Sequence, residues 1–121
     1  MLLANKADTA IEILSRIQLA YEYLPTWLKP AVVVWNKSEI IFSNKSAIKG
    51  FATASDSARG YSANCVICDE FSFVPNNIAN KVFESIYPVI SSSKKSKFII
   101  VSTPNGADPN NLYYNLWQQA S

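Results

Sequence analysis

The strongest constraint on the fold comes from two short, uninterrupted apolar runs that each stop abruptly at polar residues. Cys65–Cys68 is followed at once by the acids Asp69 and Glu70, and Phe98–Val101 is followed by the sequence Ser-Thr-Pro-Asn-Gly. Continuous apolar runs of this length are typical of strands that are buried on both faces of a parallel sheet. The chain is therefore expected to contain two neighbouring interior strands of an α/β fold.

A helix is expected between these two strands. Apolar residues recur every four positions from about Asn77 to Ile90, and Pro88 is expected to disturb the last turn. Strand, helix and strand within roughly forty residues is the spacing of a parallel crossover connection. This unit forms the predicted centre of the domain.

The flanking segments add helices and a hairpin to this centre. Apolar residues recur at helical spacing over residues 8–24, and a closing helix is expected over residues 109–120. Residues 32–52 contain three short β-type runs separated by polar turns, which predicts an antiparallel meander. Residues 53–63 are small and polar, as in a loop. We expect one α/β unit over residues 1–121, with a mainly parallel sheet and an added β-hairpin.

Composition limits the possible partners. Of the 121 residues 49% are apolar and 17% are charged, as in a folded protein rather than a disordered segment. The net charge is only +2, and the tight basic cluster Lys94, Lys95 and Lys97 is too small to establish a nucleic-acid partner. No apolar run approaches membrane-spanning length, so a soluble intracellular protein without a membrane partner is expected.

The two cysteines, Cys65 and Cys68, have a C-x-x-C spacing that would suit a redox pair or half of a zinc site. Both lie in an apolar run that is predicted to be a strand, and residues three apart on a strand point to opposite faces. The chain has no histidine and no second C-x-x-C. We therefore expect small buried side chains rather than metal ligands.

The acids at the end of the first strand are the leading candidates for chemistry. Ligands of open parallel sheets bind beyond the carboxyl ends of the strands. There, Asp69 would hold a hydrated Mg²⁺ on a nucleotide, and Glu70 would act as the catalytic base for the water that attacks the γ-phosphate. The alternative is that the two acids cap the next helix or face solvent.

Polar residues elsewhere extend this candidate site. The hydroxyls of Ser102 and Thr103 follow the second strand and could sense the γ-phosphate, although the adjacent Pro-Asn-Gly would also suit an ordinary turn. Arg59 precedes Gly60 in a loop of small residues, from which a flexible arginine could reach a phosphate. The alternative for Arg59 is a surface salt bridge.

A phosphate-binding loop is missing from these 121 residues. The chain has three glycines, Gly50, Gly60 and Gly106, and none forms part of a G-x-x-x-x-G-K-[ST] pattern. Without such a loop the β- and γ-phosphates have neither a backbone cradle nor a lysine.

Several segments resemble the large terminase subunit of T4-like tailed phages, over nearly the whole chain. The most idiosyncratic are Trp35-Asn36-Lys37 before the hairpin and Pro88-Val89-Ile90-Ser91-Ser92 before the last strand. The others are Lys6-Ala7, Leu24-Pro25, Arg59-Gly60, Asp69-Glu70, Thr103-Pro104-Asn105-Gly106, Tyr114 and Trp117.

This resemblance implies an ASCE-type P-loop NTPase fold, a three-layer sandwich that couples ATP hydrolysis to translocation of double-stranded DNA into the procapsid. It implies Walker B chemistry for Asp69 and Glu70, and an arginine finger at Arg59 that reaches a neighbouring subunit. It also implies a coupling-motif role for three residues, Ser102, Thr103 and Asn105. The implied cofactors are ATP and Mg²⁺. The implied partners are double-stranded DNA, the portal protein and the small terminase subunit, in the host cytoplasm and transiently on the procapsid portal.

The chain departs from the family pattern in length. It is expected to represent the Walker B and coupling-motif part of the ATPase domain, without the Walker A segment and the nuclease domain. On its own it is expected to be inactive, and an exposed strand edge predicts self-association. Two alternatives remain open: another P-loop helicase or translocase, and a non-enzymatic binding or oligomerisation module.

Overall fold

The computed structural model describes residues 1–54, 60–91 and 94–120. They form an α/β unit with three α-helices and a mixed sheet. The strands are β1 (Leu2–Ala4), β2 (Val32–Trp35), β3 (Glu39–Phe42), β4 (Ala47–Ala52), β5 (Cys65–Asp69) and β6 (Lys97–Val101). The helices are α1 (Ala7–Glu22), α2 (Asn76–Ser91) and α3 (Leu112–Ala120), with short 3₁₀ turns η1 (Thr26–Leu28) and η2 (Phe71–Phe73).

The described strands form one sheet in the order β2-β3-β4-β1-β5-β6. The strands β4, β1, β5 and β6 run parallel to one another, whereas β2, β3 and β4 form an antiparallel meander. The predicted meander over residues 32–52 and the predicted parallel pair β5–β6 are therefore confirmed. Because four parallel strands share one direction, their carboxyl ends lie along a single edge of the sheet.

The central strand β1 was not predicted from the sequence. Its residues Leu2, Leu3 and Ala4 are all buried, and Leu3 pairs with Phe51 of β4 and with Cys68 of β5. Three residues are too few to display the alternation or the run length by which a strand is recognised. This short strand connects the hairpin half of the sheet to the β5–β6 half.

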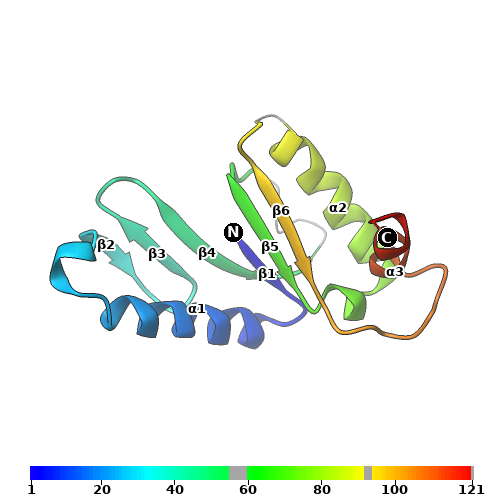
Figure 1. Ribbon diagram of the computed structural model, residues 1–121, viewed down its shortest axis with the longest axis horizontal. Coiled ribbons are helices and arrows are strands. Elements are labelled where there is room, and N and C mark those ends of the chain that lie inside the picture. Colours follow the sequence, from blue (N-terminus) through cyan, green and yellow to red (C-terminus); the bar gives the residue numbers. More distant parts are fainter. Residues whose placement is uncertain (55–59, 92–93, 121) are drawn as a thin grey trace.

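Helices cover both faces of the sheet. Successive side chains of β1 point to opposite faces, and each face packs against a different helix. Leu2 packs with Leu14 of α1 and Ile40 of β3, while Leu3 packs in a separate cluster with Val82 of α2. Figure 1 shows α1 beside the hairpin strands and α2 beside β5 and β6. The described chain thus has the layer order helix, sheet, helix.

The range of α2 agrees with the prediction of about 77 to 90, whereas the start of α3 differs from the prediction. The last turn of α2 continues through Pro88 to Ser91. The missing amide of Pro88 would have bonded the carbonyl of Glu84, and both residues are exposed, so water can satisfy that carbonyl. Helix α3 begins at Leu112 rather than at residue 109, because the Asn111 side chain accepts a hydrogen bond from the Tyr114 amide and caps the helix there.

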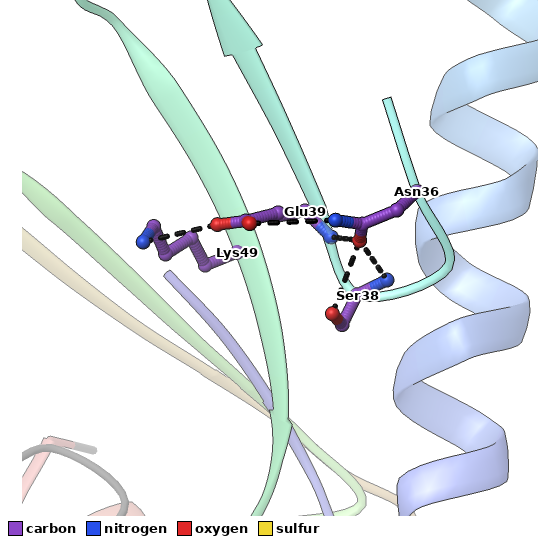
Figure 2. A network of polar contacts seen from close by, with 4 residues as sticks. All are labelled: Asn36, Ser38, Glu39 and Lys49. Atoms are coloured by element: carbon purple, nitrogen blue, oxygen red, sulfur yellow. Dashed lines mark hydrogen bonds and ion pairs between the residues drawn. The ribbon is translucent and has the colours of Figure 1, made fainter. Parts of the chain in front are cut away.

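The hairpin is anchored by the side chain of Asn36, as Figure 2 shows. Its Oδ1 accepts hydrogen bonds from the amides of Ser38 and Glu39, each at 2.9 Å. Glu39 forms an ion pair with Lys49 of β4 at 3.0 Å, and the hydrogen bond from Lys49 is the main reason why the pKa of Glu39 is lowered. The Trp-Asn-Lys segment therefore sets the turn from β2 into β3.

Both cysteines lie on β5, as predicted, and both are free thiols. Cys68 is fully buried in the cluster against α2, and burial raises the pKa of its thiol to about 12. This thiol stays protonated at neutral pH, so Cys68 packs as a small apolar side chain. None of the helices in the described part of the chain has the length and hydropathy needed to cross a bilayer.

Candidate functional site

The carboxyl ends of β5 and β6 bring the predicted site residues together. Asp69, the last residue of β5, is in register with Val101, the last residue of β6. The residues that follow, Glu70 on one strand and Ser102 and Thr103 on the other, consequently leave the sheet side by side. Thr103 Oγ1 donates a hydrogen bond to Glu70 Oε2 at 3.3 Å, across a sequence separation of 33 residues.

Glu70 has a left-handed backbone conformation, with φ of 53° and ψ of 38°. This conformation turns the chain sharply from β5 into η2, where Phe71 is 1% exposed within the apolar cluster against α2. An L residue other than Gly, Asn or Asp pays a steric penalty of about 1 kcal/mol or more in this region. Strain of this kind is concentrated at functional sites, where the surrounding structure maintains it.

Ser72 is a buried polar residue at the centre of the site, and sequence reasoning did not identify it. It is 2% exposed and lies between Glu70 and the segment that follows β6. Its amide donates to Ser102 Oγ at 3.1 Å, its Oγ lies 2.7 Å from Ser102 Oγ, and its hydroxyl donates to the Thr103 carbonyl at 2.6 Å. The turns after β5 and β6 are thereby connected through one serine.

Asn105 and Asn111 extend the same network to α3. The side-chain amides of both residues donate to the Ser72 carbonyl, at 3.3 Å from Asn105 and 2.8 Å from Asn111. Tyr113 of α3 donates its hydroxyl proton to the Ser102 carbonyl at 3.1 Å. The predicted site residue Asn105 therefore contacts η2 in this structure, whereas Thr103 contacts Glu70.

The carboxyl end of β4 lies at the same edge of the sheet and adds one buried polar residue, Thr53. Arg59 lies outside the described residues, and the next residue, Gly60, has a φ of 78°. Thr53, which directly follows β4, is 8% exposed, and its Oγ1 is buried without a hydrogen-bond partner among the described residues. A buried hydroxyl without a partner is able to bind a water molecule or a ligand oxygen.

The donor groups at this edge fit a hydrated magnesium ion held together with a nucleotide. Asp69 and Glu70 are both half-buried, so their carboxylates retain access to solvent at the end of the sheet. Mg²⁺ keeps several waters and commonly takes only one or two protein carboxylates, with phosphates completing its shell. Within the described ranges no cluster of three or more acidic, His or Cys side chains forms a closed metal cage.

A pocket of about 430 Å³ borders the turn after β6. The residues that line it include Ser102 and Asn105 and the α3 aromatics Tyr113, Tyr114 and Trp117. The pocket therefore shares Ser102 and Asn105 with the candidate site.

The strained backbone of Glu70 gives a direct stability test. Replacing Glu70 by Gly in the 121-residue chain is expected to raise the free energy of unfolding by about 1 kcal/mol, because Gly adopts positive φ without the Cβ clash. Urea unfolding followed by circular dichroism measures this difference.

Glu70→Ala, which keeps the Cβ, serves as the control and is expected to give no gain. Lys45→Gly, at a φ of 68° in the β3–β4 turn, is expected to give a similar gain. A loss of stability in Glu70→Gly would show that Glu70 is not held under strain.

One comparison with known proteins bears on this arrangement. The sequence model of the family described as "Terminase large subunit, T4likevirus-type, N-terminal" matches residues 1–120 of the chain. The match covers every strand and helix described above, including both turns that form the candidate site.

Proposed function

The chain belongs to the T4likevirus-type terminase large subunit family, as part of its N-terminal region, and has a role in phage DNA packaging; from this premise we propose that it carries the catalytic acids of an ATP-hydrolysing DNA translocase. The observation that supports this proposal most is the contact between Thr103 and Glu70 at the carboxyl ends of two neighbouring parallel strands. This is the edge at which nucleotides bind in open α/β sheets.

Each acid has a distinct proposed role. The carboxylate of Asp69 holds a hydrated Mg²⁺, and the ion, when bound, neutralises charge that develops on the phosphates. Glu70 accepts a proton from the attacking water as the general base. Glu70 follows β5 in a left-handed turn, and the hydrogen bond from Thr103 orients its carboxylate.

The residues after β6 are proposed to detect the nucleotide. The Thr103 hydroxyl can turn from Glu70 to a γ-phosphate, and Asn105 has a second amide proton to donate. The Ser102 hydroxyl contacts Ser72 and would have to leave that contact to reach the phosphate or its replacement water. Because Thr103 also contacts Glu70, loss of the γ-phosphate would change the position of the catalytic base. Arg59 is proposed to act as an arginine finger on the nucleotide of a neighbouring subunit.

The fold is proposed to be of the ASCE P-loop NTPase class, with β5 as the Walker B strand and β6 as the adjacent sensor strand. Helices on both faces of the sheet and the parallel order β4-β1-β5-β6 support this assignment. The antiparallel β2–β3 pair is an addition at the far edge. Double-stranded DNA, the portal protein and the small terminase subunit are the proposed partners. The proposed location is the host cytoplasm, with transient docking on the procapsid portal.

The proposal can be tested by supplying the element that binds phosphate. Residues 1–121 alone are expected to hydrolyse no ATP, because none of their three glycines forms a phosphate-binding loop. Joining the chain to an upstream strand, G-x-x-x-x-G-K-[ST] loop and helix gives what we call the loop-joined protein. It is expected to release phosphate from ATP in the presence of Mg²⁺ and to stop when EDTA is added.

The control is the same protein with the loop lysine replaced by Ala, which removes a direct contact to the β- and γ-phosphates. Activity in this control would indicate a contaminating ATPase. A folded loop-joined protein that neither binds nor hydrolyses Mg²⁺-ATP would contradict the proposal and favour a non-enzymatic binding module.

A further inference from the structure

The amide, carbonyl and hydroxyl of Ser72 all form hydrogen bonds with one segment of the chain, residues 102–111. A serine in a 3₁₀ turn ordinarily bonds its own turn or solvent. Ser72 is 2% exposed, whereas the partners of its hydroxyl are the half-buried Ser102 and the exposed Thr103, so removal of the hydroxyl would disconnect a buried turn from a more exposed one.

Counting protons gives one arrangement that satisfies together the three hydrogen bonds made by the Ser72 amide and hydroxyl. A hydroxyl has one proton to donate. The Ser72 hydroxyl donates to the Thr103 carbonyl at 2.6 Å, so the 2.7 Å contact requires the Ser102 hydroxyl to donate to Ser72 Oγ. Ser102 Oγ then accepts from the Ser72 amide at 3.1 Å. The result is a closed circuit between the two turns, in which the Ser102 proton goes to Ser72 Oγ rather than to the Thr103 carbonyl, which lies 3.0 Å from Ser102 Oγ.

This circuit fixes the part of the chain that orients the proposed catalytic base. The Thr103 carbonyl is held by Ser72, and the Thr103 side chain donates to Glu70. Glu70 itself lies only two residues before Ser72, in a backbone conformation that must be maintained by its surroundings. We propose that Ser72 is a positioning residue, which sets the Thr103–Glu70 geometry and, through Asn111, transmits changes in that geometry to helix α3.

The connection to α3 rests on Asn111. This residue is 7% exposed and caps α3 through its Oδ1, while its Nδ2 donates to the Ser72 carbonyl. Tyr113 adds a second link, to the Ser102 carbonyl. Any movement of the turn after β6 relative to η2 would therefore break or shift contacts at the first turn of α3. The inference rests on the proposed ATPase function, since it assigns Ser72 to the same site.

The first test measures kinetics in the loop-joined protein. Ser72→Ala is expected to lower kcat for ATP by roughly 10- to 100-fold, with the KM for Mg²⁺-ATP changed less than about threefold, because a displaced base affects the chemical step and not binding. Ser85→Ala is the matched control. Its hydroxyl is also partly buried and donates to the Val82 carbonyl at 2.8 Å within α2, so its loss should leave both constants unchanged.

The second test needs no catalysis and uses the 121-residue chain. Amide hydrogen exchange of Ser72→Ala is expected to be at least about tenfold faster across α3 than in the parent chain, while α1 keeps its protection. Ala retains the backbone carbonyl that accepts from Asn111, so the variant tests the hydroxyl alone, and unchanged protection across α3 would overturn the transmission from the Ser72 hydroxyl to α3. Loss of protection in α1 and α3 alike would overturn it as well, since Ser72 would then support the whole fold.

Failure of this inference can be distinguished from failure of the proposed function. If the parent loop-joined protein hydrolyses ATP and Glu70→Gln does not, but Ser72→Ala matches the parent in kcat, only the positioning role of Ser72 is refuted. If the parent itself shows no Mg²⁺-dependent hydrolysis, the ATPase proposal fails and the role of Ser72 fails with it. A kcat loss of equal size in Ser85→Ala would also refute a specific role for Ser72.

Discussion

Replacing Glu70 by Gln is expected to lower the kcat of Mg²⁺-dependent ATP hydrolysis by about 10²- to 10⁴-fold in the loop-joined protein. Gln has the same length as Glu, and its Oε1 can still accept the hydrogen bond from Thr103, but it cannot accept a proton from the attacking water. Binding of Mg²⁺-ATP should persist, because the proposed contacts of Asp69 and of the phosphate-binding loop are unchanged. Steady-state phosphate release and a fluorescent-nucleotide titration measure the two quantities.

Glu39→Gln is the matched control for this substitution. It removes a carboxylate from the ion pair with Lys49 in the hairpin, on the other half of the sheet from β5 and β6. Its kcat is expected to equal that of the parent protein. Unchanged turnover in Glu70→Gln would remove Glu70 from the role of general base, whatever the result for Glu39→Gln.

Replacing Phe71 by Ala is expected to lower the free energy of unfolding by about 3–5 kcal/mol. The Phe71 ring is 1% exposed and packs in the cluster formed by β1, β5 and α2, so its removal leaves a cavity that this short turn cannot close. The measurement is urea unfolding of the 121-residue chain. Because Phe71 separates Glu70 from Ser72, the same ring anchors the turn that presents both residues.

Phe73→Ala provides the control within the same 3₁₀ turn. The Phe73 side chain is 44% exposed, so its removal should cost less than about 1 kcal/mol. The difference between the two losses in the free energy of unfolding separates the effect of burial from the general effect of removing an aromatic ring. Equal losses in both variants would contradict the placement of Phe71 as the anchor.

Most elements of the fold could be predicted because their patterns are long enough to be distinctive. The helical period over α1 and α2 and the apolar runs of β5 and β6 each give an unambiguous signal, and the polar turns at Asn36 and Asn44 delimit the hairpin. The strand β1 gave no such signal. Its three residues become a central strand only because β4 and β5 provide hydrogen-bonding partners on both sides, which is a property of the tertiary structure.

The start of α3 illustrates a related limit. The closing helix was expected to begin at residue 109, and proline there is compatible with the first turn of a helix. In the structure Asn111 takes the capping position instead, and Asn110 donates its amide to the Asp108 side chain in a turn before the helix. Two adjacent asparagines both suit a helix cap, and only their contacts with the rest of the chain distinguish them.

The acids and hydroxyls of the candidate site could be identified from the sequence, but Ser72, which connects them, could not. Asp69, Glu70, Ser102 and Thr103 follow buried strands directly, and this position alone marks them as candidates. Ser72 carries no comparable signal, because a serine between two phenylalanines after an acidic pair is also what a surface turn would contain. Its role depends on the register of β5 against β6, which brings residue 102 beside residue 72.

The central claim is that the carboxyl ends of β5 and β6 hold the reactive end of Mg²⁺-ATP. The most direct measurement is a crystal structure of the loop-joined protein with Mg²⁺ and a non-hydrolysable ATP analogue. We expect a magnesium-bound water to contact the Asp69 carboxylate and Glu70 to lie within hydrogen-bonding distance of a water beside the γ-phosphate. Thr103 is expected to contact the γ-phosphate or Glu70. A nucleotide bound with its γ-phosphate away from Asp69, Glu70 and Thr103 would refute the proposed site.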